Sequence, residues 1–344
     1  MLTFGLNFGL WHFVRHGIPW TGLSLMMCLA TLVFAPLSKS QSGKPLRVTP
    51  PGKSKKTASG NVRSDALRID VNVVLVPVVV TDAMNHPIEG LEKENFILSE
   101  NDEQREIEYF STEDAPISVG LLLDLSGSMK DKFEAEREAV TEFFRNANSQ
   151  DDYFVITFSN RPTVLTQATQ SIDAIQSSLG TVTPNGKTAM LDAISIAMAR
   201  MHSAKYNRHA LLIVSDGGDN SSRISFRGVK RLVRDSDVDV YAIGLFDTVI
   251  FKTFEELMGK TWLSEITDAT GGRTLTIDSS TKIPEAAATI SRLLRNQYVL
   301  GYRPNNAQPD GKRRRIRVQT INPASERTQL QAHYKRGYVV PKED

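Results

Sequence analysis

The chain has 344 residues, of which 40% are hydrophobic and 23% charged, and its formal net charge is +2. This is the composition of an ordinary globular protein, and the near-neutral charge excludes a global electrostatic attraction to nucleic acid. The single cysteine, Cys28, lies in an apolar N-terminal stretch, so the rest of the chain has no disulfide, cysteine nucleophile or cysteine-ligated zinc. The six histidines are scattered and form no spaced pair of the helical zinc-site type.

Residues 1–40 are expected to be a signal peptide or a membrane anchor. A basic start precedes an apolar run over residues 18–37, and small polar residues follow it. The run is long enough to span a bilayer, but two prolines shorten its helix, which favours a cleaved signal. Lipidation at Cys28 is a third form, disfavoured by the bulky methionines before it. Each form predicts an extracytoplasmic protein that is periplasmic, secreted or associated with the cell envelope.

The next segments predict a linker and two β-rich flanks. Residues 41–65 are rich in Ser, Pro, Gly and Lys, which indicates a basic disordered linker, either a solvated tether or a contact for anionic lipid. Residues 66–115 and 297–344 show the alternation and β-branched content of short strands. Because each flank is too short to fold alone, we expect the two to pair into one small β-sandwich with a domain inserted between them.

Residues 116–296 alternate between strand and helix patterns. Strands are predicted at 119–123, 153–158, 210–215, 238–243 and 273–277, and helices at 130–148, 172–179, 189–202, 226–234, 254–269 and 283–294. This order predicts an α/β domain with a doubly wound, mostly parallel sheet covered on both faces. Ligands of such sheets bind beyond the carboxyl ends of the strands, where Asp124 and Asp216 each end an apolar run.

Three loops at this edge carry oxygen donors. Asp124, Ser126 and Ser128 follow the first strand, Thr188 precedes a helix, and Asp216 follows a later strand. Carboxylate and hydroxyl oxygens are ligands that suit Mg²⁺, Ca²⁺ or Mn²⁺ rather than zinc. Each residue alone also has an ordinary structural explanation, the hydroxyls as helix caps and the aspartate as a turn residue.

Other candidate motifs are interpreted as structural. Asp192 and Asp219 are expected to be capping or solvated residues. The sequence 186–188 lacks the earlier glycine that a phosphate-binding loop needs. The basic run 312–315 has no interleaved aromatic residues and is expected to form a solvated hairpin turn.

Taken together, the donor motifs resemble the von Willebrand factor A (VWA) family, whose signature is Asp-x-Ser-x-Ser, then Thr before a helix, then Asp-Gly after a strand. The flanks resemble those of secreted bacterial proteins that embed such a domain between β segments. The resemblance implies a metal-ion-dependent adhesion site, or MIDAS. Ser126, Ser128 and Thr188 would offer hydroxyl oxygens, and Asp124 and Asp216 would bind directly or through water.

The resemblance implies an exported, non-enzymatic binding protein that holds Mg²⁺, or Mn²⁺ or Ca²⁺ in its place. An Asp or Glu of a protein partner would complete the coordination, and nucleic acid is not an expected partner. The alternatives are a metal-dependent hydrolase and a structural scaffold with a non-functional metal site. The hydrolase is disfavoured because no histidine or obvious general base accompanies these loops.

Overall fold

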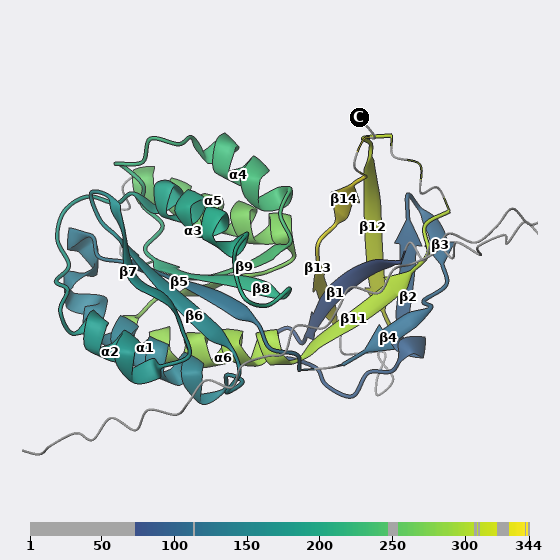
Figure 1. Ribbon diagram of the computed structural model, residues 1–344, viewed down its shortest axis with the longest axis horizontal. Coiled ribbons are helices and arrows are strands. Elements are labelled where there is room, and N and C mark those ends of the chain that lie inside the picture. The colour runs from purple at the N-terminus through teal and green to yellow at the C-terminus, as the bar shows by residue number, and fades with distance from the viewer. Residues whose placement is uncertain are drawn as a thin grey trace, which may run out of the picture. The chain divides into compact units, whose positions relative to one another are not determined.

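The computed structural model describes residues 73–112, 114–246, 254–305, 308, 310–321, 330–340 and 342. The expected signal or anchor and the expected linker lie outside these ranges. Within them, no helix combines the length and the apolar character needed to cross a membrane. The described part contains a central α/β unit and two antiparallel sheets (Figure 1).

The α/β unit is organised around a six-stranded sheet with the order β10-β9-β8-β5-β6-β7. Its strands are β5 (Ser118–Asp124), β6 (Asp152–Phe158), β7 (Pro162–Thr169), β8 (His209–Ser215), β9 (Val238–Leu245) and β10 (Thr274–Ile277). All neighbours pair in parallel except β7, which runs antiparallel to β6. The sequence prediction missed β7, because an edge strand with one exposed side lacks the buried apolar run that marks the others.

Helices cover both faces of this sheet, as predicted. On one face lie α1 (Phe133–Arg145), α2 (Ile172–Leu179) and α6 (Ile283–Arg295), and on the other lie α3 (Met190–Met201), α4 (Phe226–Arg234) and α5 (Phe254–Thr270) (Figure 1). Leu121 and Leu123 pack into the first layer and Leu122 into the second. The predicted helix at 130–148 is shorter, since a 3₁₀ segment, η2 (Gly127–Lys132), precedes α1.

The strand order reverses at β5, which places the predicted donors at one point. From β5 the chain builds outward through β6 and β7, and then returns to build β8, β9 and β10 on the other side. β5 and β8 are therefore adjacent, with Leu123 paired to Val214. Such a reversal leaves a crevice at the carboxyl ends of the two strands. Asp124 ends β5, and Asp216 directly follows β8.

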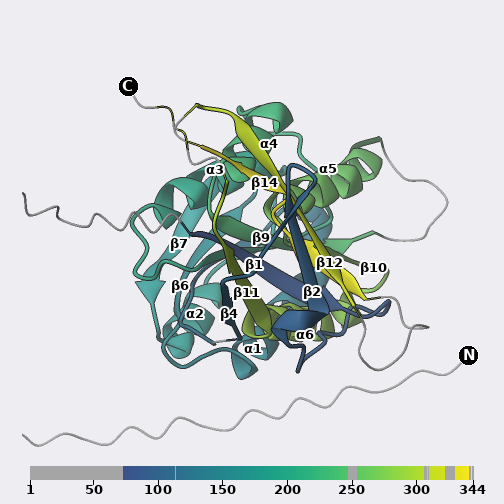
Figure 2. The same ribbon diagram turned by 90° about the vertical axis from the view of Figure 1, so that its right-hand side faces the viewer.

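The two flanks form the predicted sandwich. One sheet has the order β13-β1-β11-β4 and the other β14-β12-β2-β3, so each combines strands from both ends of the described chain (Figure 2). N-terminal elements are β1 (Val74–Thr81), η1 (Lys93–Asn95), β2 (Phe96–Glu100), β3 (Glu103–Arg105) and β4 (Tyr109–Ser111). C-terminal elements are β11 (Gln297–Tyr302), β12 (Arg313–Thr320), β13 (Gln331–Tyr334) and β14 (Gly337–Val339). Val78 and Leu300 from the first sheet share a core with Leu98 and Val318 from the second.

The basic run 312–315 is not the predicted turn, because most of it belongs to β12. Alternation along the strand exposes Arg313 and Arg315 and buries Arg314. The Arg314 guanidinium lies 3.1 Å from an Asp310 carboxylate oxygen, so the one inward cation is paired. A run of four cations can therefore form a strand when its side chains divide between the two faces.

Deleting residues 297–344 should destabilise the N-terminal flank, because β1 pairs with β11 on one side and β13 on the other. Without them β1 loses both neighbours and exposes Val76 and Val78, which are buried. Limited proteolysis read by mass spectrometry should show early cleavage within residues 73–112, with the α/β unit as the internal control. Unchanged protection of those residues would contradict the pairing.

Candidate metal centre

Asp124 is the fixed point of the predicted site. Its side chain is fully buried at the end of β5, and both carboxylate oxygens accept hydrogen bonds. Oδ1 accepts from the backbone N–H of Ser126 at 2.9 Å, and Oδ2 accepts from the Ser215 hydroxyl at 2.5 Å. These two bonds set the orientation of the carboxylate. Ser215, the last residue of β8, was assigned no role by the sequence analysis.

Ser126 and Ser128 present two hydroxyl oxygens together. Their Oγ atoms lie 3.0 Å apart, with Ser126 buried and Ser128 exposed. Adjacent oxygens of an octahedral ion with ligand distances near 2.05 Å are separated by about 2.9 Å, so the observed spacing fits two neighbouring ligands of a Mg²⁺-like ion. Ser126 occupies the cap position of η2 without a side-chain capping bond. The helix-cap explanation therefore does not account for its hydroxyl.

Thr188 is held by the loop that follows β8. Its N–H donates to the Asn220 side-chain oxygen at 3.0 Å, and its carbonyl accepts from the N–H groups of Asn220 and Ser221. The cap position of α3 is Ala189, so Thr188 is not the cap that the structural explanation requires. Its side-chain hydroxyl makes no hydrogen bond to any residue placed in the structure, while its backbone is fixed from two sides.

Asp216 begins the loop after β8 and is nearly buried. Its Oδ1 accepts from the Gly218 N–H at 3.3 Å. Gly217 between them has a φ of +79°, and a Cβ there would lie 2.8 Å from the carbonyl carbon of Gly259 on α5. Only glycine fits this close approach, so the loop that carries Asp216 is held tightly against α5.

Asp219 has a capping role, one of the two roles expected from the sequence, whereas Asp192 bonds to the loop before α4. Asp219 accepts from the Leu191 N–H in the first turn of α3 at 2.8 Å. Asp192 accepts from the N–H groups of Arg223 and Ile224, each about 3.0 Å away. Both carboxylates therefore stabilise the loop around Thr188 and Asp216 rather than adding donors to the site.

The two predicted carboxylate ligands repel each other. Burial, followed by the nearby Asp216 carboxylate, raises the pKa of Asp124 to about 7 from its ordinary value of 3.8. A divalent cation between the two would offset both effects by favouring the charged forms. The fixed carboxylate, the paired hydroxyls and this repulsion all fit a hard cation.

Glu136 is a third carboxyl group at this position that the sequence prediction missed. It is fully buried on α1, and its Oε1 accepts from the backbone N–H of Asp124 at 3.1 Å. Its Oε2 is buried without a hydrogen-bond partner in the described chain. Burial, with Asp124 next, raises its pKa well above the ordinary value. The sequence signal was available, because Glu136 lies on the apolar face of α1 with Phe133, Val140 and Phe143.

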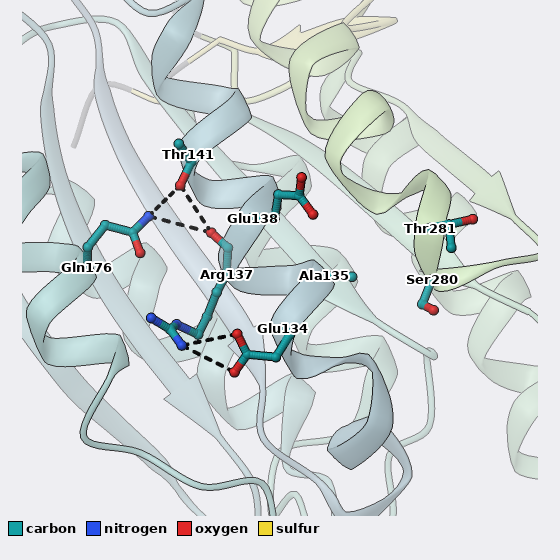
Figure 3. A pocket seen from close by; sticks show the side chains of 8 residues that line it. All are labelled: Glu134, Ala135, Arg137, Glu138, Thr141, Gln176, Ser280 and Thr281. Atoms are coloured by element: carbon teal, nitrogen blue, oxygen red, sulfur yellow. Dashed lines mark hydrogen bonds and ion pairs between the residues drawn. The ribbon is translucent and has the colours of Figure 1, made fainter.

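The five predicted ligands contain only two carboxylates. The described ranges also contain no cluster of three or more His, Cys, Asp or Glu side chains that could hold a metal ion. A separate hollow lies between α1, α2 and η3 (Ser280–Lys282) (Figure 3). There the Arg137 guanidinium is paired with Glu134, and the Gln176 amide with Thr141. These contacts pair the charged groups of Arg137 and Glu134, although the buried Nε of Arg137 has no hydrogen-bond partner in the described chain.

Comparison with known proteins finds a matching domain family and similar solved structures. Residues 119–218 match the von Willebrand factor type A domain family. None of the curated protein sequences matches the chain. Similar solved structures include an aerotolerance-related membrane protein from Bacteroides fragilis NCTC 9343 carrying multiple mutations to serines. It is 17% identical, with 51% of this chain and 98% of that chain covered and a TM-score of 0.40.

Two further solved structures are similar over more of the chain. A von Willebrand factor type A protein from Catenulispora acidiphila is 14% identical, covering 80% of this chain and 76% of that one, with a TM-score of 0.47. Proximal thread matrix protein 1 from the mussel byssus, in a form with a zinc-occupied MIDAS motif, is 17% identical. It covers 62% of this chain and 50% of that one, with a TM-score of 0.44.

Proposed function

Because residues 119–218 belong to a von Willebrand factor type A domain, we propose that the chain binds a protein partner through a divalent cation. The proposed ligands are Asp124, Ser126, Ser128, Thr188 and Asp216. The observation that carries the proposal is the 3.0 Å separation of two serine hydroxyls next to a buried, doubly hydrogen-bonded carboxylate. Mg²⁺ is the proposed ion, with Mn²⁺ or Ca²⁺ able to replace it.

When bound, the cation would supply an open coordination position for a carboxylate oxygen of the partner. Hydrogen bonds within the chain orient the proposed ligands. Hydrogen bonds from Ser215 and the Ser126 backbone fix Asp124, and Asn220 fixes Thr188. Two carboxylates balance a double positive charge only formally, so attraction for an incoming Asp or Glu remains. The partner side chain would complete the coordination.

We propose binding rather than catalysis, in an extracytoplasmic location. No histidine placed in the structure contacts the five donors. His86 bonds to Asp82, and His333 contacts Thr81 in the β flank. The site thus offers fixed oxygen ligands without an adjacent histidine to accept and return a proton. The location rests on the apolar N-terminal run and the basic segment after it.

The test is a comparison with and without chelator. Immobilised protein should retain a partner from an extracytoplasmic extract in Mg²⁺ and release it in EDTA. Mg²⁺ at about 100 times its dissociation constant should raise the free energy of unfolding by about 2.7 kcal/mol. Retention that survives EDTA, together with an unfolding transition unaffected by Mg²⁺, would contradict the proposal and favour a structural scaffold. Turnover of a phosphoester or peptide that is lost in Asp124→Ala would favour a hydrolase.

A further inference from the structure

Exposed cations lie around the proposed metal site at the carboxyl ends of the strands, although the site itself is acidic. Each comes from a different segment, and each segment contacts or contains part of the site. We call them the cationic rim: Lys130, Arg161, Lys187, Arg223 and Lys260.

Three of the rim residues lie in or beside the serine and threonine loops. Lys130 lies in η2, two residues after Ser128. Lys187 directly precedes Thr188, and its N–H donates to the Asn160 side chain at 2.9 Å. Arg161 follows Asn160, in the loop that leaves the carboxyl end of β6. These three cations therefore border the loops that carry the hydroxyl donors.

The other two rim residues border the loop that carries Asp216. Arg223 lies in that loop, where its N–H donates to the Asp192 carboxylate at 3.0 Å. Lys260 follows Gly259, the α5 residue against which Gly217 packs. The rim therefore reaches all three loops of the site and the helix next to them.

The rim is not neutralised by the described chain. None of its five side chains forms an ion pair with a described residue. Among exposed cations elsewhere, some are paired, such as Arg145 and Arg315, and others are not, such as Lys93. Asp192 and Asp219, acids of the same region, bond to backbone N–H groups, and with Asp131 they formally offset three of the five positive charges. Asp131, beside Lys130, is the exposed acid of η2. Once a divalent cation balances Asp124 and Asp216, the edge carries a net positive charge.

We infer that the partner presents an acidic protein segment, with further carboxylates around the one that reaches the cation. This inference rests on the proposed metal-dependent binding and specifies its partner. Exposed charges contribute little singly, typically up to about 1 kcal/mol each, but several of one sign raise association rates and select complementary surfaces. With a Debye length of about 10 Å at 0.1 M salt, the effect should weaken as salt increases.

Two synthetic peptides test the inference on the full chain. One has a single central Asp in a Gly-Ser sequence, and the other has the same Asp flanked on both sides by Glu. Fluorescence anisotropy in Mg²⁺ at low salt should show at least tenfold tighter binding of the acidic peptide. The advantage should shrink at high salt. It should disappear when all five rim residues are changed to Gln, while the Mn²⁺ affinity of that variant is equal or higher.

The matched control changes five exposed cations away from this edge to Gln: Lys93, Lys205, Arg303, Lys312 and Arg317. It has the same net charge as the rim variant and should keep the preference for the acidic peptide. Equal Mg²⁺-dependent binding of the two peptides would overturn the cationic rim as a partner-selecting surface and leave the proposed function intact. Equal binding of the acidic peptide in Mg²⁺ and in EDTA would instead overturn the metal-dependent function.

Discussion

Replacing Asp124 with alanine should abolish cation binding and partner binding together. The carboxylate is the buried donor at the end of β5, and two hydrogen bonds fix its orientation toward the other proposed ligands. Changes to residues that merely support metal ligands typically cost 10–100-fold in affinity, so loss of a ligand should cost at least about 100-fold. Isothermal titration with Mn²⁺ and the chelator-sensitive binding assay are the two measurements.

A second variant separates loss of the site from loss of folding. Alanine also leaves the Ser215 hydroxyl and the Ser126 N–H without their acceptor. Each buried donor left unpaired should lower the free energy of unfolding by about 1–3 kcal/mol. Asp124→Asn keeps the shape and can still accept a hydrogen bond, so it should fold in EDTA as well as the unchanged protein while binding no Mn²⁺. Asp131→Asn, an exposed acid of η2, should keep its Mn²⁺ affinity within about threefold. Mn²⁺ binding retained by Asp124→Asn would contradict the assigned ligand.

The sequence predicted the architecture because its strongest patterns come from burial on both sides of a sheet. Apolar runs such as 119–123 are typical of central parallel strands, and they appear as expected between two helical layers. The edge strand β7 was missed for the opposite reason, since one side faces solvent. In β12, the run of four cations hid an alternation that the buried Arg314 makes possible.

The candidate ligands could be proposed from sequence because each lies at a strand or helix boundary. Residues at the boundaries on one edge of a sheet lie close together in the fold. Their supports could not be proposed in the same way. Ser215 reaches Asp124 only because β5 and β8 are adjacent, a pairing set by the return of the chain across the sheet. Glu136 reaches the same residue from α1, through a helix-to-strand contact. Spacing along the chain specifies neither contact.

The metal-free protein should become less stable as the pH rises from about 4 to about 7. The folded-state pKa of Asp124 is raised to about 7 from 3.8 by burial and by Asp216, so the folded state holds a proton that the unfolded state has already released. The resulting stability is fully present below about pH 4 and is lost as the pH rises through about 7. Asp124 alone could account for a decrease on the order of 4 kcal/mol, and the raised pKa of Glu136 acts in the same direction.

Urea unfolding followed by circular dichroism at pH 5, 6, 7 and 8 measures this decrease. In EDTA the free energy of unfolding should fall across the series, and saturating Mg²⁺ should restore it at pH 8, where the carboxylates are charged. Glu136→Gln keeps an acceptor for the Asp124 N–H but removes a buried acid, so its decrease in EDTA should be smaller. Glu134→Gln, an exposed position on the same helix, should match the unchanged protein. A free energy of unfolding that does not change with pH in EDTA would show that burial and carboxylate repulsion do not disfavour the charged forms in the folded state. The repulsion that makes the site attractive to a cation would then be absent.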